Sequence, residues 1–186
     1  MLKKILLGSV MTALTAGIAL ASPVAPYVGA GLGVVTNTAN SSNNFGSNRG
    51  VPFNLFAGYG GVIGESFYLA GELIGTVGTG VLSDNGVLKT TYGYGASIIP
   101  GVMLSEHTLA FVRAGAVRSR FSDLSQNQTG GQFGLGLQTG LTQNVDLRGE
   151  YDYTAYRSVN WNSNGVHRST SPRQDAFNLS LVYKFE

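Results

Sequence analysis

Hydrophobic and polar residues alternate along residues 145–156, which read VDLRGEYDYTAY. One side of the alternation holds Val145, Leu147, Tyr151 and Tyr153, and the other holds Asp146, Arg148, Glu150 and Asp152. A repeat of two residues is typical of a β-strand. A soluble sheet would bury the leucine and tyrosine face, whereas a membrane barrel would turn that face to lipid and enclose the charges.

The same pattern predicts eight strands, over residues 26–35, 51–60, 67–77, 89–103, 108–121, 132–141, 145–157 and 175–185. Four long polar connections begin at Thr36, Gly78, Ser122 and Ser158. They alternate with three short ones, at residues 61–66, 104–107 and 142–144. This order is typical of an up-and-down barrel with long outer loops and short periplasmic turns. A β-sandwich with crossing connections has no reason to follow it.

Aromatic residues mark both ends of the predicted outer face. Near the loop end these residues are Phe53, Tyr92, Phe133, Tyr153 and Phe177, and near the turn end they are Tyr59, Phe67, Tyr183 and Phe185. The positions between them hold leucines 55, 69, 73, 135, 137, 147, 179 and 181. An apolar band between two aromatic girdles is the pattern of a strand barrel in a membrane.

The opposite face is rich in glycine, as in Gly29, Gly31 and Gly33 or Gly134 and Gly136. Glycine weakens a strand that faces solvent, because it offers no side chain to pack. Inside a narrow eight-stranded cylinder, small residues leave room for a few long ones. The charges of residues 145–156 are therefore predicted to point inward, into a closed barrel that satisfies its backbone groups in lipid.

The N-terminus has the features of a secretory signal peptide. MLKK is followed by the uncharged apolar run ILLGSVMTALTAGIAL and by Ala19-Leu20-Ala21, a small-x-small cleavage pattern. The alternative, a membrane-anchoring helix, needs about 20 apolar residues, more than this run offers. The predicted division is residues 1–21 as signal peptide and residues 22–186 as one barrel domain.

Removal of Lys3 and Lys4 with the signal peptide changes the charge balance. The whole chain has 12 Lys and Arg against 10 Asp and Glu, so 10 basic residues then face 10 acidic ones. A nucleic-acid-binding face would need a clustered excess of Lys and Arg, and none is left. The chain has no cysteine, which excludes a disulfide framework and a lipoprotein attachment site.

Three segments resemble a known family: PYVGAGLGVV near the start, FGLGLQTGLTQNVDLRGEYDYT, and FNLSLVYKFE at the end. They look like the eight-stranded transmembrane domain of outer membrane protein A (OmpA-type barrels) and, more distantly, the opacity-type barrels. The resemblance implies a buried Glu and Arg pair, which falls on Glu72 and Arg148. This chain departs from the family's pattern at Gly31, where the family has a lumen lysine, and at Gln138, where the family has a second lumen glutamate.

The residue pattern extends this pair to an interior ion-pair network. Its predicted members are Glu72, Arg113, Asp146, Arg148, Glu150, Asp152 and Lys184. Pairing of the last two strands should bring Asp146 close to Lys184 at the periplasmic end. Charges held in a narrow interior must be paired, because removal of one partner leaves the other as an unpaired buried charge.

Catalysis has one candidate, the segment VHRSTS, in which His167 and Ser169 mimic a His-x-Ser dyad of lipid A-modifying barrel enzymes. Here the dyad falls in the longest predicted loop, without a positioned base or orienting group. His107, beside Glu106 in a short turn, is interpreted as a solvated turn residue. With two histidines and no cysteine, the sequence predicts no metal site and no cofactor.

We therefore expect a monomeric, non-enzymatic outer membrane barrel of a Gram-negative envelope, with a structural and surface role. Expected partners are outer membrane lipid and lipopolysaccharide, the barrel assembly machinery, and a host or matrix ligand. Adhesion would use the loops at residues 36–50 and 158–173, the second of which carries Trp161 and Val166 as an apolar anchor. The alternatives are a lipid A-modifying enzyme and a small-solute pore, because fold alone does not give function.

The cleavage pattern yields the first prediction. The mature protein should begin at Ser22, because the signal is removed after Ala21. N-terminal sequencing of the protein from the membrane fraction measures this directly. Retention of Met1 would refute it.

Overall fold

The computed structural model describes residues 24–41, 44–84, 90–121, 127–157, 159–163 and 166–185. The predicted signal peptide, residues 1–21, lies outside the described residues. Within the described ranges there is no helix that is long and apolar enough to cross a membrane. The described elements are all strands.

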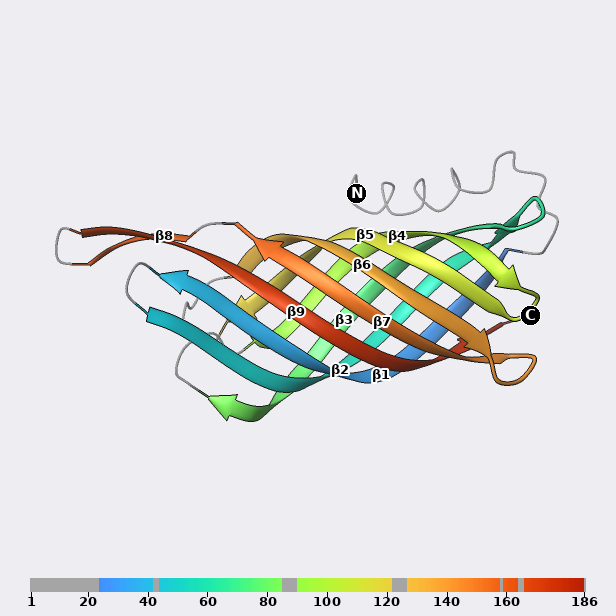
Figure 1. Ribbon diagram of the computed structural model, residues 1–186, viewed down its shortest axis with the longest axis horizontal. Helices are drawn as coiled ribbons and strands as arrows, with labels where there is room; N and C mark the ends of the chain where they lie inside the picture. Colours follow the sequence, from blue (N-terminus) through green and yellow to red (C-terminus); the bar gives the residue numbers. More distant parts are fainter. Residues whose placement is uncertain are drawn as a thin grey trace, which may run out of the picture.

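Nine strands are described: β1 (Ala25–Ser41), β2 (Asn44–Ile63), β3 (Phe67–Asp84), β4 (Thr90–Ser105), β5 (Thr108–Phe121), β6 (Asn127–Gly140), β7 (Val145–Tyr156), β8 (Val159–Ser163) and β9 (Val166–Lys184). Each of β1 to β6 pairs antiparallel with the next strand in sequence, and β7 pairs with β9. Pairing of β1 with β9, from Tyr27 opposite Lys184 onward, closes the cylinder (Figure 1). The predicted eight-stranded antiparallel up-and-down barrel is confirmed, with β8 outside it.

The polar connections are the part of the sequence prediction that was wrong. β1 and β2 continue through most of residues 36–50 and remain paired from Val35 opposite Gly50 to Ser41 opposite Asn44. In residues 158–173, β8 pairs with the first part of β9 and forms a hairpin beyond the barrel (Figure 1). Asn, Ser and Thr favour turns, so composition predicted loops. The ladder of the barrel strands instead extends into these segments.

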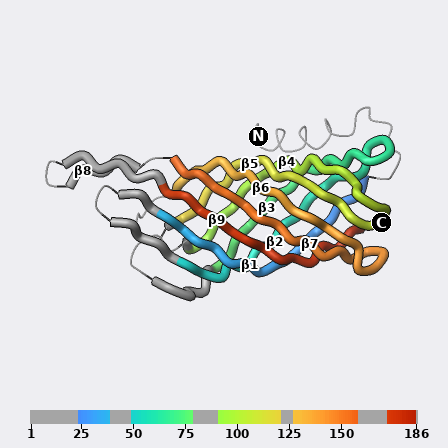
Figure 2. Tube along the Cα trace, viewed as in Figure 1, coloured from blue at the N-terminus to red at the C-terminus, as the bar shows by residue number. Residues whose placement is uncertain are grey.

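The short turns agree with the prediction. They lie between β2 and β3, between β4 and β5, and between β6 and β7, all at the end where β1 begins and β9 ends (Figure 2). Gly64 has a φ of 68° in the first of these turns, a conformation that glycine adopts without steric cost. The three turns therefore join neighbouring strands directly and fix their order around the barrel.

The outer face carries the predicted apolar band. Its exposed members include Leu55, Leu73, Leu135, Leu137, Leu179 and Leu181, flanked by exposed aromatic residues such as Phe133 and Phe177 at one end and Tyr59 and Tyr183 at the other. Leu73 is 66% exposed and Leu135 is 55% exposed. A surface that faces water would not expose large apolar side chains so regularly. Tyr153 and Leu147 belong to the same face and are half-buried by their neighbours.

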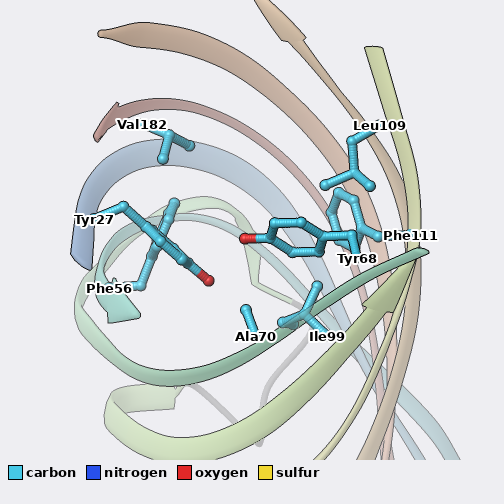
Figure 3. Packing of buried hydrophobic residues seen from close by; sticks show 8 residues of the cluster. All are labelled: Tyr27, Phe56, Tyr68, Ala70, Ile99, Leu109, Phe111 and Val182. Carbon is cyan, nitrogen blue, oxygen red and sulfur yellow. The ribbon is translucent and has the colours of Figure 1, made fainter. Parts of the chain in front are cut away.

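The interior near the turn end holds an apolar cluster that the sequence interpretation missed. Its members are Tyr27, Phe56, Tyr68, Ala70, Ile99, Leu109, Phe111 and Val182, which point inward from six strands (Figure 3). Glycines make room for two of the rings: a Cβ at Gly58 would meet the ring of Tyr27, and one at Gly136 would meet Phe111. This cluster fills the lumen near its turn end.

Candidate functional site

Arg113 on β5 is the centre of the charged lumen, with a side chain only 1% exposed. Its Nη2 donates to Glu72 Oε1 at 2.6 Å and to Glu150 Oε2 at 3.0 Å, and its Nε donates to Glu150 Oε1. Nη1 donates to Ser97 Oγ at 3.2 Å. A guanidinium offers five donors in a planar fork, so one arginine joins groups from three other strands.

Arg148 on β7 lies beside this centre and is equally buried. Its Nη1 donates to Glu72 Oε2 at 2.6 Å, and its Nε donates to Gln138 Oε1 at 2.8 Å. Three rings of the apolar cluster surround its guanidinium carbon, with centroids at 5.5 Å for Tyr27, 4.7 Å for Phe56 and 5.1 Å for Phe111. The aromatic faces attract the cation, which offsets part of its loss of hydration.

Glu72 on β3 connects the two arginines, because each of its carboxylate oxygens binds one guanidinium. Oε2 also accepts a hydrogen bond from the Tyr27 hydroxyl at 3.0 Å. The side chain has no exposure to solvent. A fully buried carboxylate with three donors is satisfied, and removal of either arginine would leave charge without compensation.

Asp152 and Asp146 extend the network in opposite directions. Asp152 Oδ1 lies 3.6 Å from Arg113 Nε, and its Oδ2 accepts from Asn178 at 2.9 Å. Asp146 Oδ2 accepts from Gln138 at 2.6 Å, and its Oδ1 lies 3.1 Å from Lys184 Nζ. Lys184 is 36% exposed, so this outermost pair marks the turn end of the lumen.

Uncharged polar groups fill the lumen on the loop side of the arginines. Thr76 donates to Asn54 at 2.8 Å, and Asn54 donates to Asn178 at the same distance. A small cavity of about 40 Å³ lies here, with room for a few water molecules at most. Gln132 and Asp152 line it, and each has one buried oxygen without a hydrogen-bond donor among the described residues.

All seven residues predicted for the lumen point into it, and the structure joins five of them around Glu72 and Arg113. Asp146 and Lys184 form their own pair, linked to the rest through Gln138. Sequence reasoning missed Tyr27, whose hydroxyl and ring both contact the network. A signal was present, because Tyr27 shares its alternation with the inward glycines 29, 31 and 33.

The other candidate residues lie on the hairpin formed by β8 and β9. Trp161 is opposite Arg168, and Val166 is opposite Ser163. His167 and Ser169 occupy strand positions opposite Asn162 and Asn160. The side chains of these residues lie outside the described part of the structure. Among the described residues, no three His, Cys, Asp or Glu side chains are grouped so that they could hold a metal ion.

Comparison with known proteins identifies the family. The model of the outer membrane protein beta-barrel domain matches residues 6–185 of the 186 residues. This chain belongs to that outer membrane β-barrel family. The protein is therefore located in the outer membrane, and its apolar outer band faces lipid.

Several solved structures are similar to this barrel. The attachment invasion locus protein Ail of Yersinia pestis is 17% identical, with a TM-score of 0.49 over 87% of this chain and 99% of that one. Neisserial surface protein A is 19% identical, with a TM-score of 0.48 over 88% and 100%. OprG of Pseudomonas aeruginosa is 9% identical, with a TM-score of 0.47 over 91% and 100%. No curated protein matches the chain.

The lumen geometry yields a stability prediction. Arg148→Ala should lower the free energy of unfolding by about 3–5 kcal/mol, because Glu72 and Gln138 lose a buried partner. Arg120→Ala, on the exposed outer side of β5, should change it by less than about 0.5 kcal/mol. Urea titration of the two variants in the same detergent, followed by circular dichroism, measures both values. Equal stability of the two variants would contradict the network.

Proposed function

We propose that this protein acts at the cell surface, where the strand extensions at its loop end contact a host or matrix component while the lumen stays closed. The observation that carries this proposal is the length of the strands. β2 has 20 residues and β9 has 19, whereas a tilted strand crosses a membrane with about 9–11. About half of each strand is therefore available outside the lipid.

The chemistry of the extensions suits a polar partner. Residues 36–50 read TNTANSSNNFGSNRG, in which amide and hydroxyl side chains predominate and Arg49 is the one charge. The hairpin of β8 and β9 adds Trp161, Val166 and Arg168. Amides and hydroxyls donate and accept hydrogen bonds, and tryptophan and arginine are frequent anchors of binding interfaces. Groups held on paired strands bind at less entropic cost than groups on loops.

The proposed role is not catalytic. His167 and Ser169, the one candidate dyad, lie beyond the last pairs that β9 makes with the barrel, Asn40 opposite Ser171 and Ala155 opposite Arg173. They are therefore placed beyond the barrel wall, away from the level of the acyl chains. A lipid-modifying enzyme would need its nucleophile and base near the lipid face.

The packed lumen supports a closed barrel over a small-solute pore. The arginines, their carboxylates and the aromatic cluster occupy the cross-section, and the cavity on the loop side measures about 40 Å³. Eight strands enclose an interior only just wide enough for such side chains. Ions would cross only if the network rearranged.

Removal of the hairpin tests the surface role. Replacement of residues 159–169 with a short glycine-serine turn should leave a folded barrel but lower binding to intact host cells and matrix proteins at least about tenfold. A variant with the same residues in scrambled order controls for length and composition. Binding of purified protein in detergent is the measurement. Wild-type binding by the deletion variant would refute a role for the hairpin.

Electrical recording tests the closed lumen. The purified wild-type monomer in a planar bilayer should show no large, steady conductance, because its charged residues are paired and buried. Arg148→Ala, which opens a space beside Glu72, provides a comparison. A large and steady current through the wild-type monomer would favour the pore and overturn the closed-lumen proposal.

A further inference from the structure

Two arginines on β5 face away from the lumen. Inward residues of this strand, such as Arg113 and Ser119, are buried, whereas Arg118 and Arg120 alternate with them and are exposed. They therefore project from the outer face of the barrel near its loop end. An outward charge on a membrane strand is unusual, because transfer of arginine to the lipid face is costly toward the midplane.

Their neighbours place them at the height of the membrane interface. Arg118 is opposite Tyr94 and Arg120 is opposite Tyr92 on β4. Both rings are exposed on the same outer face, Tyr94 at 52% and Tyr92 at 38%. Tyrosines on the outside of a barrel gather at the level of the lipid headgroups. The two arginines are thus placed at headgroup level, each opposite a tyrosine on β4.

Neither arginine has a carboxylate partner in the described part of the chain. The ion pairs among the described residues involve Arg113, Arg148 and Lys184 and lie in the lumen. On the other side, Thr129 and Asn127 of β6 are opposite Arg118 and Arg120, and both are neutral. Two adjacent cations in this setting attract an external anion.

Below the arginines the outer face carries small residues. Ala116, the next outward residue of β5, is opposite Ala96 on one side and Gly131 on the other. A Cβ added at Gly131 would meet nothing within 4 Å. Larger side chains are exposed next to these residues: Ile98 and Phe133, which lie opposite Ala114 on its two sides. The three small residues, Ala96, Ala116 and Gly131, form a low apolar surface, here called the recess, on which a hydrocarbon chain could lie directly under the two charges.

Among the described residues, the most exposed charges at the two ends of the barrel differ in sign. At the loop end the exposed charged residues include Arg49, Arg118, Arg120, Arg157 and Arg173, whereas the turns expose Glu65 and Glu106. The loop end of such barrels faces the outside of the cell. Arg118 and Arg120 therefore lie at the end of the barrel that meets an outer leaflet with negative headgroups.

We propose that Arg118 and Arg120 bind the phosphate of a phosphorylated glycolipid of the outer leaflet, with one acyl chain in the recess formed by Ala96, Ala116 and Gly131. Guanidinium groups match phosphate oxygens with two parallel hydrogen bonds each, which are stronger than neutral ones. Tyr92 and Tyr94 offer hydroxyls to the sugar. This site goes beyond the proposed surface role and does not depend on it.

Paired arginine variants test the phosphate contact. R118Q/R120Q should weaken binding of bis-phosphorylated lipid A to the detergent-solubilised protein at least about tenfold, because charge-assisted bonds are lost. R49Q/R173Q removes the same charge elsewhere on the loop end and should stay within about twofold of wild type. R118K/R120K keeps the positive charges but lacks the planar guanidinium groups, so its loss of lipid A affinity should be intermediate. Titration of each folded variant, checked by circular dichroism, measures these affinities.

A second pair of variants tests the recess. Gly131→Leu should fill it and weaken lipid A binding, whereas Gly71→Leu, at an equally open outward position on β3, should not. Inorganic phosphate should bind the wild type at least about a hundredfold more weakly than lipid A, since it lacks the acyl chain. The proposal is overturned if R118Q/R120Q binds like wild type, if R49Q/R173Q loses as much, or if phosphate alone or phosphatidylglycerol binds as well as lipid A.

Discussion

The pairing of β1 with β9 is the contact on which the rest of the molecule depends. Without it, both strands would leave a row of backbone groups unpaired in lipid, where no water can satisfy them. Closure after eight strands also fixes the diameter of the cylinder, so the interior must be filled by side chains and not by solvent. The composition of the inward face follows from that diameter, with glycines opposite the largest residues.

Arg148 shows how the interior resolves this constraint. The residue lies between a carboxylate from β3 and rings from three other strands, so its charge and its hydrophobic stem are both matched. Arg113 is matched by two carboxylates, those of Glu72 and Glu150. Because each pair joins strands far apart in sequence, the network ties opposite walls of the barrel together. A closed lumen and a rigid support for the strand extensions follow from the same contacts.

The alternation of residue types was sufficient to predict the faces and the strand order, whereas the pairing of Glu72 with Arg148 was expected from the family resemblance. The alternation could not predict the apolar cluster, because periodicity assigns a side chain to a face but gives no reason for aromatic residues inside a barrel. Tyr27 and Phe56 were missed for that reason, although the glycines around them were a sign. The strand extensions were missed because Asn and Ser are poor strand formers by themselves. There, continuation of an existing ladder outweighs the local propensity.

Arg113 and Arg118 differ in environment because they are five positions apart, an odd number, on one strand and therefore lie on opposite faces. The first is buried among carboxylates, and the second is exposed at the lipid interface. A slip of one residue in the register of β5 would exchange the two faces, placing Arg118 in the lumen and Arg113 in lipid. The buried ion pairs oppose such a slip, because an unpaired charge is costly both in the lumen and in lipid. The interior network thus also determines which arginines the barrel presents to the membrane, and it couples the stability of the lumen to the charge of the outer surface.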